Sequence, residues 1–175
     1  MPVNVIENRD GWTKTFREGW LQHYETTGET DWDRYNRPNH KTLPIGDGID
    51  PTTARLMLVT SAGSYLKDDQ APFDDETVIG DYSTRRYPAN TPFDALGYAH
   101  GHYDQSAVRT DPQVLVPLKH LADMVAEGLI DELAPEVISF NGYQPDMTRV
   151  EDETLPDIIR AAKEMQVTAV LLVPS

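Results

Sequence analysis

Arg55-Leu-Met-Leu-Val-Thr60, followed by Ser61-Ala-Gly63, is the stretch of sequence that decides the fold. Its apolar residues do not alternate with polar ones, which is typical of a strand covered on both faces in a parallel sheet. The small residues that follow favour a tight turn at the carboxyl end of this strand. A second apolar run, Thr168-Ala-Val-Leu-Leu-Val-Pro174, predicts another buried strand just before Ser175. Together the two runs indicate an α/β domain.

Three further strands are expected, over residues 81–87, 94–98 and 136–140. The first lies in a long polar excursion and Pro88 breaks it, so we expect it at an edge of the sheet. Because the strands alternate with helical segments, we expect a parallel or mostly parallel sheet with flanking helices.

The spacing of apolar residues predicts two flanking helices. One covers residues 117–127, and Gly128 follows it where a left-handed C-cap residue belongs. The other follows the acidic stretch Glu151-Asp-Glu153, whose charge is favourable near a helix N-terminus. Pro156 fits best in the first turn of this helix, and a longer helix kinked at Pro156 is the alternative. The apolar positions are Leu118, Leu121, Met124 and Val125 in the first helix and Ile158, Ile159, Ala162 and Met165 in the second.

Aromatic residues recur every four positions between residues 10 and 24 and predict a helix with one aromatic stripe: Trp12, Phe16, Trp20 and Tyr24. The stripe requires a partner surface, so we expect this helix on the outside of the domain or against a second subunit. An aromatic cage for a ligand is the alternative. Residues 26–51 are rich in Gly, Pro and polar groups, which favours a linker or an extended arm over the body. We therefore expect an N-terminal helix and arm over residues 1–51 and an α/β domain over residues 52–175.

The charge of the chain excludes some classes of partner. Its 175 residues include 15 Lys and Arg against 29 Asp and Glu, and the formal net charge of −14 argues against nucleic acid as a partner. Its apolar runs are far shorter than the roughly 20 residues that cross a bilayer, and the N-terminus lacks the pattern of a signal peptide. We expect a soluble, cytoplasmic protein without a membrane partner, and the absence of cysteine fits a reducing compartment.

Small or polar residues follow four of the expected strands. Because the carboxyl ends of parallel strands meet at one edge of a sheet, we expect these residues to converge on one crevice. They are Ser61 and Gly63, the segment from His100 to Asp104, Asn141 and Gly142, and Ser175.

His100-Gly-His102-Tyr-Asp104 is the densest group of polar residues in the chain. Two histidines two positions apart share one side of an extended backbone, so they could bind a metal ion with Asp104 as a third ligand. Acid–base chemistry is a second interpretation, since a histidine beside a carboxylate titrates close to neutral pH. Simple hydrogen bonding within a loop is the third.

One further motif indicates a structural role, and the common motifs of serine hydrolases and nucleotide-binding proteins are absent from the sequence. Asp111 precedes Pro112 and is expected to begin or cap a turn. Ser61 and Ser175 do not lie in a Gly-x-Ser-x-Gly elbow, and the sequence has no glycine-rich nucleotide fingerprint or Walker loop. Serine hydrolase chemistry and nucleotide binding therefore have no support.

A series of short blocks occurs in order along residues 56–175. The blocks are Leu58-Val-Thr-Ser-Ala-Gly63, Gly80-Asp81, His100-Gly-x-Tyr-Asp104, Asp111-Pro112, Val116-Pro-Leu118, Glu127-Gly-Leu-Ile130 and Leu133-Ala-Pro135. This series resembles the selenoprotein B components of the glycine, sarcosine, betaine and D-proline reductases and their shorter bacterial relatives. The aromatic helix and the arm lie outside the resemblance.

The resemblance implies an oxidoreductase of amino acid metabolism. Such an enzyme cleaves the C–N bond α to a carboxylate in a small amino acid or amine, with electrons from a thiol or thioredoxin-like donor. The resemblance implies His100 and Asp104 as catalytic residues. It implies a substrate pocket lined by Ser61, Gly63, His102, Tyr103, Asn141 and Gly142. His102 departs from the family, whose members usually have glycine at this position.

In such enzymes a redox pair, selenocysteine or cysteine followed after two residues by cysteine, comes directly after a strand similar to residues 169–174. The chemistry needs a soft, easily ionised nucleophile that forms a covalent adduct and then a reducible bond, and Ser175 has neither property. We therefore expect no cofactor in this chain and a selenocysteine or cysteine after Ser175. Termination at a selenocysteine codon, processing, or expression of a fragment would each leave the C-terminal part of the family domain absent.

Without that residue, the 175-residue form is expected to be inactive as a reductase unless another chain supplies the redox group, in a homo- or hetero-oligomer. The alternative is a non-catalytic subunit with the same fold that binds a small molecule or serves in assembly.

Overall fold

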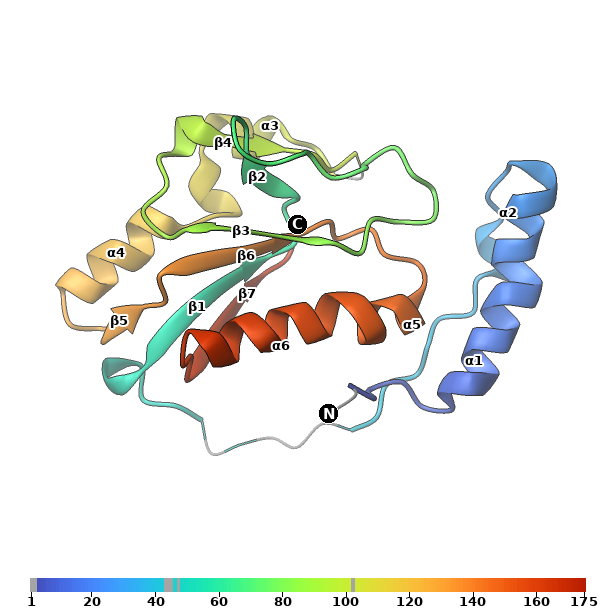
Figure 1. Cartoon of the computed structure of the whole chain (residues 1–175), viewed down its shortest axis with the longest axis horizontal. Helices are drawn as coiled ribbons and strands as arrows, with labels where there is room; N and C mark the ends of the chain where they lie inside the picture. The colour runs from blue at the N-terminus through green and yellow to red at the C-terminus, as the bar shows by residue number, and fades with distance from the viewer. Residues whose placement is uncertain (1–2, 43–45, 47, 102) are drawn as a thin grey trace.

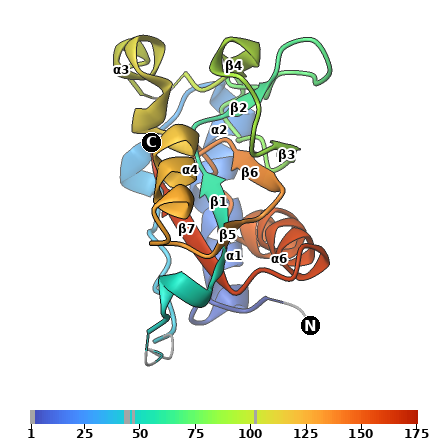
Figure 2. The same cartoon turned by 90° about the vertical axis from the view of Figure 1, so that its left-hand side faces the viewer.

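A mostly parallel sheet lies at the centre of the molecule, with α4 (Leu118–Ala126) against one face and α6 (Leu155–Glu164) against the other (Figures 1 and 2). The computed structural model describes residues 3–42, 46, 48–101 and 103–175. The strands of the central sheet are β1 (Arg55–Thr60), β3 (Thr84–Pro88), β5 (Glu132–Leu133), β6 (Glu136–Phe140) and β7 (Ala169–Val173). This mixed α/β architecture confirms the predicted fold class.

β1 is the central strand because it is hydrogen-bonded along both of its edges. β7 runs parallel to β1 over its length, from the pair Leu56 and Ala169 to the pair Thr60 and Val173. On the opposite edge, β5 pairs with the start of β1 and β6 with its end, both in parallel. β3 completes the sheet as an antiparallel strand beside β6.

β3 begins three residues later than expected. Asp81 makes a turn instead of starting the strand, because its carboxylate accepts hydrogen bonds from the backbone N–H groups of Asp74 and Ser83. Pro88 is the last residue of β3, as its inability to donate a ladder hydrogen bond predicts.

The strand expected over residues 94–98 is shorter and does not belong to the central sheet. Residues 93–95 form a 3₁₀ turn, and only β4 (Leu96–Tyr98) is extended. β4 pairs antiparallel with β2 (Ser64–Leu66) in a separate two-stranded ribbon. The ribbon crosses the upper end of the sheet, close to the carboxyl end of the chain (Figure 1).

Side chains of β1 enter two separate cores, one on each face of the sheet. Leu58 packs in the core that contains Leu121 of α4. Met57 and Val59 pack in the core that contains Ala161 of α6. Both faces of β1 are therefore covered, as its uninterrupted apolar sequence predicts.

The helices occur where the sequence predicts them, with two differences. Gly128 has a φ of 71° and ends α4 as expected, but Met124 on α4 is 38% exposed. Pro156 lies in the first turn of α6, as expected, and α6 directly continues the helical run of α5 and the π turn η6. The π turn precedes Pro156, whose missing N–H cannot complete a regular helical ladder. The helical segments are α1 (Arg9–Phe16), η1 (Arg17–Leu21), α2 (Gln22–Thr27), η2 (Trp32–Arg34), η3 (Pro51–Thr53), η4 (Phe93–Ala95), α3 (Ser106–Thr110), η5 (Pro112–Val114), α4 (Leu118–Ala126), α5 (Met147–Arg149), η6 (Val150–Thr154) and α6 (Leu155–Glu164).

β7 lies at the edge of the sheet and is buried on one face only. Leu171 and Val173 pack against the core that α4 covers. On the other face Val170 is 46% exposed and Leu172 is 66% exposed, because the core beside α6 is built from β1 and β6. The expectation of a buried strand is therefore correct for only one face of β7. Within the described residues, no helix has the length and apolar character needed to cross a membrane.

The first helical run, α1 through α2, stands beside α5 and outside the two cores of the sheet (Figure 1). Trp12, Phe16 and Trp20 are buried and stacked, with successive ring centroids 5.2 Å and 5.6 Å apart. The arm that follows this run closes over the rings, and Tyr35 lies edge-on to all three. The aromatic stripe is confirmed, and its partner surface is the chain's own arm together with Met147 of α5.

A buried carboxylate joins this N-terminal part to the domain. Glu151 is 1% exposed, and its Oε1 atom accepts hydrogen bonds from the backbone N–H groups of Val5 and Ile6. Its Oε2 atom lies 2.8 Å from Nε of Arg9 in an ion pair. Because a buried charge without partners is costly, these contacts hold residues 5–9 against η6.

Replacing Glu151 with glutamine is expected to destabilise the protein by about 3 kcal/mol, because the Arg9 charge and two backbone N–H groups would then face a neutral amide. Urea unfolding measures this loss. The control is Asp152→Asn, since Asp152 also pairs with Arg9 but is 60% exposed. The control is expected to lose no more than about 0.5 kcal/mol, and equal losses in the two variants would contradict the anchoring role.

Candidate functional site

The carboxyl ends of β1 and β7 meet at two serine side chains. Ser61 directly follows β1, and its hydroxyl oxygen lies 2.9 Å from the hydroxyl oxygen of Ser175. The backbone N–H of Ser175 also donates a hydrogen bond to the Ser61 hydroxyl, at 2.8 Å. Because β1 and β7 are parallel neighbours, their ends reach this edge of the sheet together.

His100 reaches the same point from the ribbon of β2 and β4. Its Nε2 atom lies 3.4 Å from the Ser175 hydroxyl oxygen, and the residue is 4% exposed. The ring of Tyr103 packs edge-on against the imidazole, with centroids 4.7 Å apart. The side-chain amide of Gln105 donates a hydrogen bond to the His100 carbonyl oxygen at 2.9 Å. Backbone and ring of His100 are thus both held in place.

Asn141 and Gly142 follow β6 and complete this group of residues. Asn141 is 1% exposed, and its Nδ2 atom lies 3.4 Å from the carbonyl oxygen of Ala99. The N–H of Gly142 donates to the Ser61 carbonyl oxygen. A Cβ atom on Gly142 would lie 3.0 Å from His100 Nε2, so the glycine leaves room beside the imidazole. We call Ser61, His100, Asn141, Gly142 and Ser175 the strand-end cluster.

Gly63 allows the ribbon to approach the sheet closely enough to form this cluster. Its φ of 63° lies in the left-handed region, and its carbonyl oxygen accepts a hydrogen bond from the N–H of Ala99. A Cβ atom on Gly63 would lie 2.3 Å from the Ala99 carbonyl oxygen, immediately before His100. Only glycine satisfies both the backbone conformation and this contact.

Buried hydroxyl groups fasten the ribbon to the sheet beneath the cluster. Ser64 Oγ lies 2.8 Å from the Tyr87 hydroxyl and 2.9 Å from Ser139 Oγ, and all three side chains are buried. Burial raises the pKa of Tyr87 above its ordinary value, so its hydroxyl stays protonated. These hydrogen bonds explain why Ser139 lies among the apolar residues of β6.

The structure brings together six of the residues that the sequence assigns to a site: Ser61, Gly63, His100, Tyr103, Asn141 and Gly142. Tyr103 packs against His100 and donates a hydrogen bond to the Ala62 carbonyl oxygen at 3.2 Å. Burial raises the pKa of the Tyr103 hydroxyl to about 12, so it stays protonated at neutral pH. Chemically, the cluster offers one imidazole for proton transfer beside two hydroxyl groups.

Asp104 is placed differently from these residues. Its carboxylate is exposed and accepts hydrogen bonds from the backbone N–H and the hydroxyl of Ser106, which hold its pKa below the usual range. Asp111 likewise caps a turn, as predicted, by accepting from the N–H of Gln113. His102 lies outside the described residues. Among those that are described, no group of three or more His, Asp or Glu side chains is arranged to bind a metal ion.

Gln105 is a residue of this site that the sequence does not reveal. Its amide joins the His100 carbonyl oxygen to Arg109, whose Nη2 atom donates to Gln105 Oε1 at 3.1 Å. A single glutamine in a polar loop belongs to no motif, so only the folded chain identifies it.

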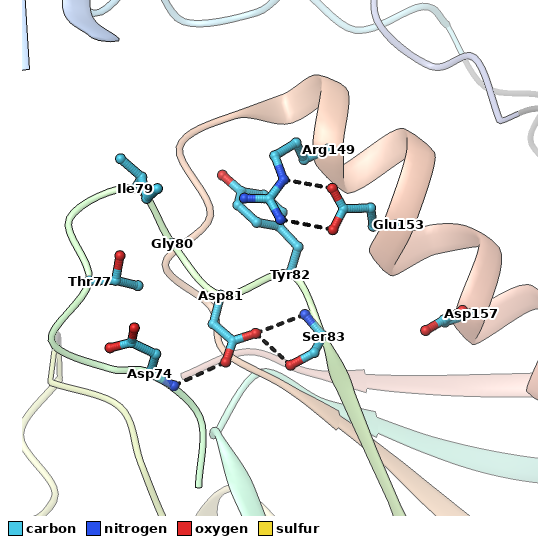
Figure 3. Close-up of a pocket in the computed structure, with 10 residues that line it drawn as sticks. All are labelled: Asp74, Thr77, Ile79, Gly80, Asp81, Tyr82, Ser83, Arg149, Glu153 and Asp157. Carbon is cyan, nitrogen blue, oxygen red and sulfur yellow. Dashed lines mark hydrogen bonds and ion pairs between the residues drawn. The ribbon is translucent and has the colours of Figure 1, made fainter. Parts of the chain in front are cut away.

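A cavity of about 490 Å³ lies elsewhere, between residues 74–83 and the helical run of α5 and α6 (Figure 3). The Arg149 guanidinium lies 4.0 Å over the ring of Tyr82 and donates two hydrogen bonds to Glu153, at 2.6 Å and 2.9 Å. Asp81 accepts hydrogen bonds from the backbone and the hydroxyl of Ser83. Since these charges have partners within the protein, we assign this cavity a structural role.

Comparison with known proteins relates the chain to one family. The family model described as Glycine/sarcosine/betaine reductase selenoprotein B (GRDB) matches residues 27–175. The match therefore includes the arm over residues 27–51, so the expectation that the arm lies outside the resemblance is wrong. The chain is 36% identical over 117 residues to the D-proline reductase subunit gamma of Acetoanaerobium sticklandii, a match that covers 67% of this chain and 47% of that protein. It is 30% identical over 109 residues to the sarcosine reductase complex component B subunit beta of Peptoclostridium acidaminophilum, covering 57% of this chain and 25% of that protein.

These matches cover only part of the length of each relative. The chain spans about half the length of the first relative and about a quarter of the second. No solved structure matches the chain significantly. The relatives therefore support the family, and what they do as whole proteins does not transfer directly.

Replacing Gly63 with alanine is expected to displace His100 and to destabilise the protein by about 3 kcal/mol, because the left-handed conformation and the contact with Ala99 both become unfavourable. The matched control is Gly128→Ala: Gly128 has a similar φ of 71°, but a Cβ atom there would meet no atom within 4 Å. The control is expected to lose only about 1 kcal/mol. Urea unfolding gives both values, and the imidazole NMR signals of His100 are expected to shift only in the Gly63 variant. Unchanged signals there would show that Gly63 does not position His100.

Proposed function

Because the chain belongs to the glycine/sarcosine/betaine reductase selenoprotein B family, we propose that it forms the substrate-binding and proton-transfer part of a reductase. The proposed reaction is reductive cleavage of the C–N bond in a small amino acid or amine. One observation carries the proposal: His100 Nε2 lies 3.4 Å from the Ser175 hydroxyl oxygen, where the carboxyl ends of the parallel strands meet.

The proposed nucleophile is a selenocysteine or cysteine that follows Ser175 or is supplied by another chain. Its selenolate or thiolate would bond to the carbon of a substrate held as its neutral amine, and as the C–N bond breaks the nitrogen would take up a proton from His100. A dithiol donor would then supply two electrons and two protons. The bond between carbon and the nucleophile breaks, the carbon takes up a proton, and the dithiol becomes a disulfide.

The other residues of the site have proposed roles that follow from their contacts. The Ser61 hydroxyl, with Asn141 and Gly142, would line the substrate pocket beside the imidazole. Asp104 would stabilise the loop that follows His100, because its carboxylate accepts hydrogen bonds from Ser106 and not from the imidazole. His102 stays a proposed pocket residue on the strength of its place in the sequence.

We also propose that the chain works as one subunit of a multi-component reductase in amino acid metabolism. The names of its relatives support this, because one is a subunit of D-proline reductase and the other belongs to component B of a sarcosine reductase complex. A thiol or thioredoxin-like donor would be available to such a complex in the reducing cytoplasm.

The protein purified from its natural source is expected to contain a redox residue after Ser175 or to be bound to a chain that carries one. Intact mass and peptide sequencing check this. A mass above 19.7 kDa with a selenocysteine or cysteine in the peptide that follows Ser175 supports the proposal. A 19.7 kDa species as the only product, without a thiol- or selenol-bearing partner, would contradict it.

In the protein expressed from its complete gene, with dithiothreitol as the donor, the change His100→Ala is expected to lower turnover about 100-fold or more, since the departing amine loses its proton source. Substrates for the assay are D-proline, sarcosine and glycine. The matched control is His120→Ala, because His120 is an exposed histidine of α4. Thermal unfolding establishes that both variants are folded. If the folded His100→Ala variant had the same turnover as the unmodified protein, the imidazole would not be the proton donor.

A further inference from the structure

A second cavity, of about 300 Å³, lies between the ribbon and α3, on the segment that leads into and out of His100. We call it the β4–α3 cavity. Its polar lining residues are Lys67, Tyr98, Gln105 and Arg109, and its apolar walls include Phe93 and Leu96. Its size is at the lower end of the range of pockets that bind small molecules, which is about 300–1,000 Å³.

Both charged residues that line the β4–α3 cavity are cations, although the chain as a whole has a formal net charge of −14. Within the described part of the chain, neither Lys67 nor Arg109 forms an ion pair with a carboxylate. Lys67 donates to the backbone carbonyl oxygen of Asp94, and Arg109 donates to the neutral amide of Gln105. Two positive charges at one cavity therefore lack a negative partner.

Tyr98 adds an independent observation at the same cavity. Its hydroxyl oxygen is buried and has no hydrogen-bond partner among the described residues. Burial raises the pKa of this hydroxyl to about 12, so it keeps its proton at neutral pH and can donate. A buried donor without an acceptor is unfavourable, so a small movement of the Tyr98 ring toward an oxygen atom of a bound ligand would gain a hydrogen bond.

We propose that the β4–α3 cavity binds a small organic anion, with its carboxylate at Lys67 and Arg109 and its apolar part against Phe93 and Leu96. Charge-assisted hydrogen bonds from the two cations supply the attraction, and the apolar walls favour an organic ligand over an inorganic ion. This binding needs neither the nucleophile nor the electron donor, so it is independent of the proposed reductase activity.

The ligand would also act on the strand-end cluster through Gln105. Gln105 accepts from Arg109 with Oε1 and donates to the His100 carbonyl oxygen with Nε2. An anion that binds the Arg109 guanidinium competes with Gln105 Oε1 for this cation. The Gln105 side chain would then move, and its hydrogen bond to the His100 carbonyl oxygen would change. Occupancy of the β4–α3 cavity is therefore expected to be visible at the imidazole.

An NMR titration of the 175-residue chain with benzoate tests the proposal. Benzoate is expected to bind saturably and to shift the signals of Arg109, Gln105 and His100. Benzylamine, which has a similar shape and the opposite charge, is expected not to bind. Inorganic phosphate is expected to bind at least about tenfold more weakly, since it gains nothing from the apolar walls.

The changes Lys67→Met and Arg109→Met are each expected to weaken benzoate binding about tenfold or more, and Tyr98→Phe about fivefold. Lys119→Met is the matched control, because Lys119 is exposed on α4 and does not line the cavity; its affinity is expected to be unchanged. Urea unfolding identifies any variant that is not folded. If Arg109→Met unfolds, the Lys67→Met variant still tests the proposal, because the hydrogen bond described for Lys67 is to Asp94 and not to Gln105 or His100.

Three results would overturn the proposal. These are no saturable benzoate binding, equal affinity in the Lys67→Met variant and the unmodified chain, or benzylamine or phosphate binding as tightly as benzoate. Benzoate binding without any shift at His100 would overturn the coupling through Gln105.

Discussion

Parallel pairing along both edges of β1 is the constraint on which the rest of the structure depends. Because β6 and β7 run in the same direction as β1, the residues that follow all three strands arrive at one edge of the sheet. Parallel strands also need crossover connections, and the helices in these connections, α4 and α6, cover the two faces of β1. One geometric fact thus accounts for the layers of the domain and for the location of its polar residues.

The imidazole in the strand-end cluster has a different origin. His100 does not follow a strand of the central sheet; it follows β4, in a ribbon that crosses the end of the sheet. A glycine with a left-handed backbone at residue 63 and a buried set of hydroxyl groups fix the ribbon in this position. The segment after β4 then connects the two features of functional interest, since Gln105 contacts His100 on one side and Arg109 on the other.

The N-terminal part is attached by a contact of another kind. Its stacked aromatic rings form a small core of their own, to which the sheet contributes no strand. The buried carboxylate of Glu151 fastens it to the domain by accepting from the backbone N–H groups of Val5 and Ile6 and pairing with Arg9, and Met147 packs against the rings. The acidic stretch around residue 151 suggested only a helix N-terminus, because its partners lie more than a hundred positions away.

Elements with local signals could be predicted from the amino-acid sequence without the structure. The apolar run of β1, the four-residue spacing of the aromatic stripe, the C-cap at Gly128 and the order of the family blocks all identify their structures without knowledge of distant contacts. The sequence also indicated that the residues after β1 and β6 converge with His100. Only the tertiary structure decided that β7 is an edge strand, that β4 leaves the sheet, that Asp104 caps a turn, and that Gln105 links His100 to Arg109. The physical reason is that these features depend on which surfaces of the chain meet after folding, and the periodicity of a single segment does not contain that information.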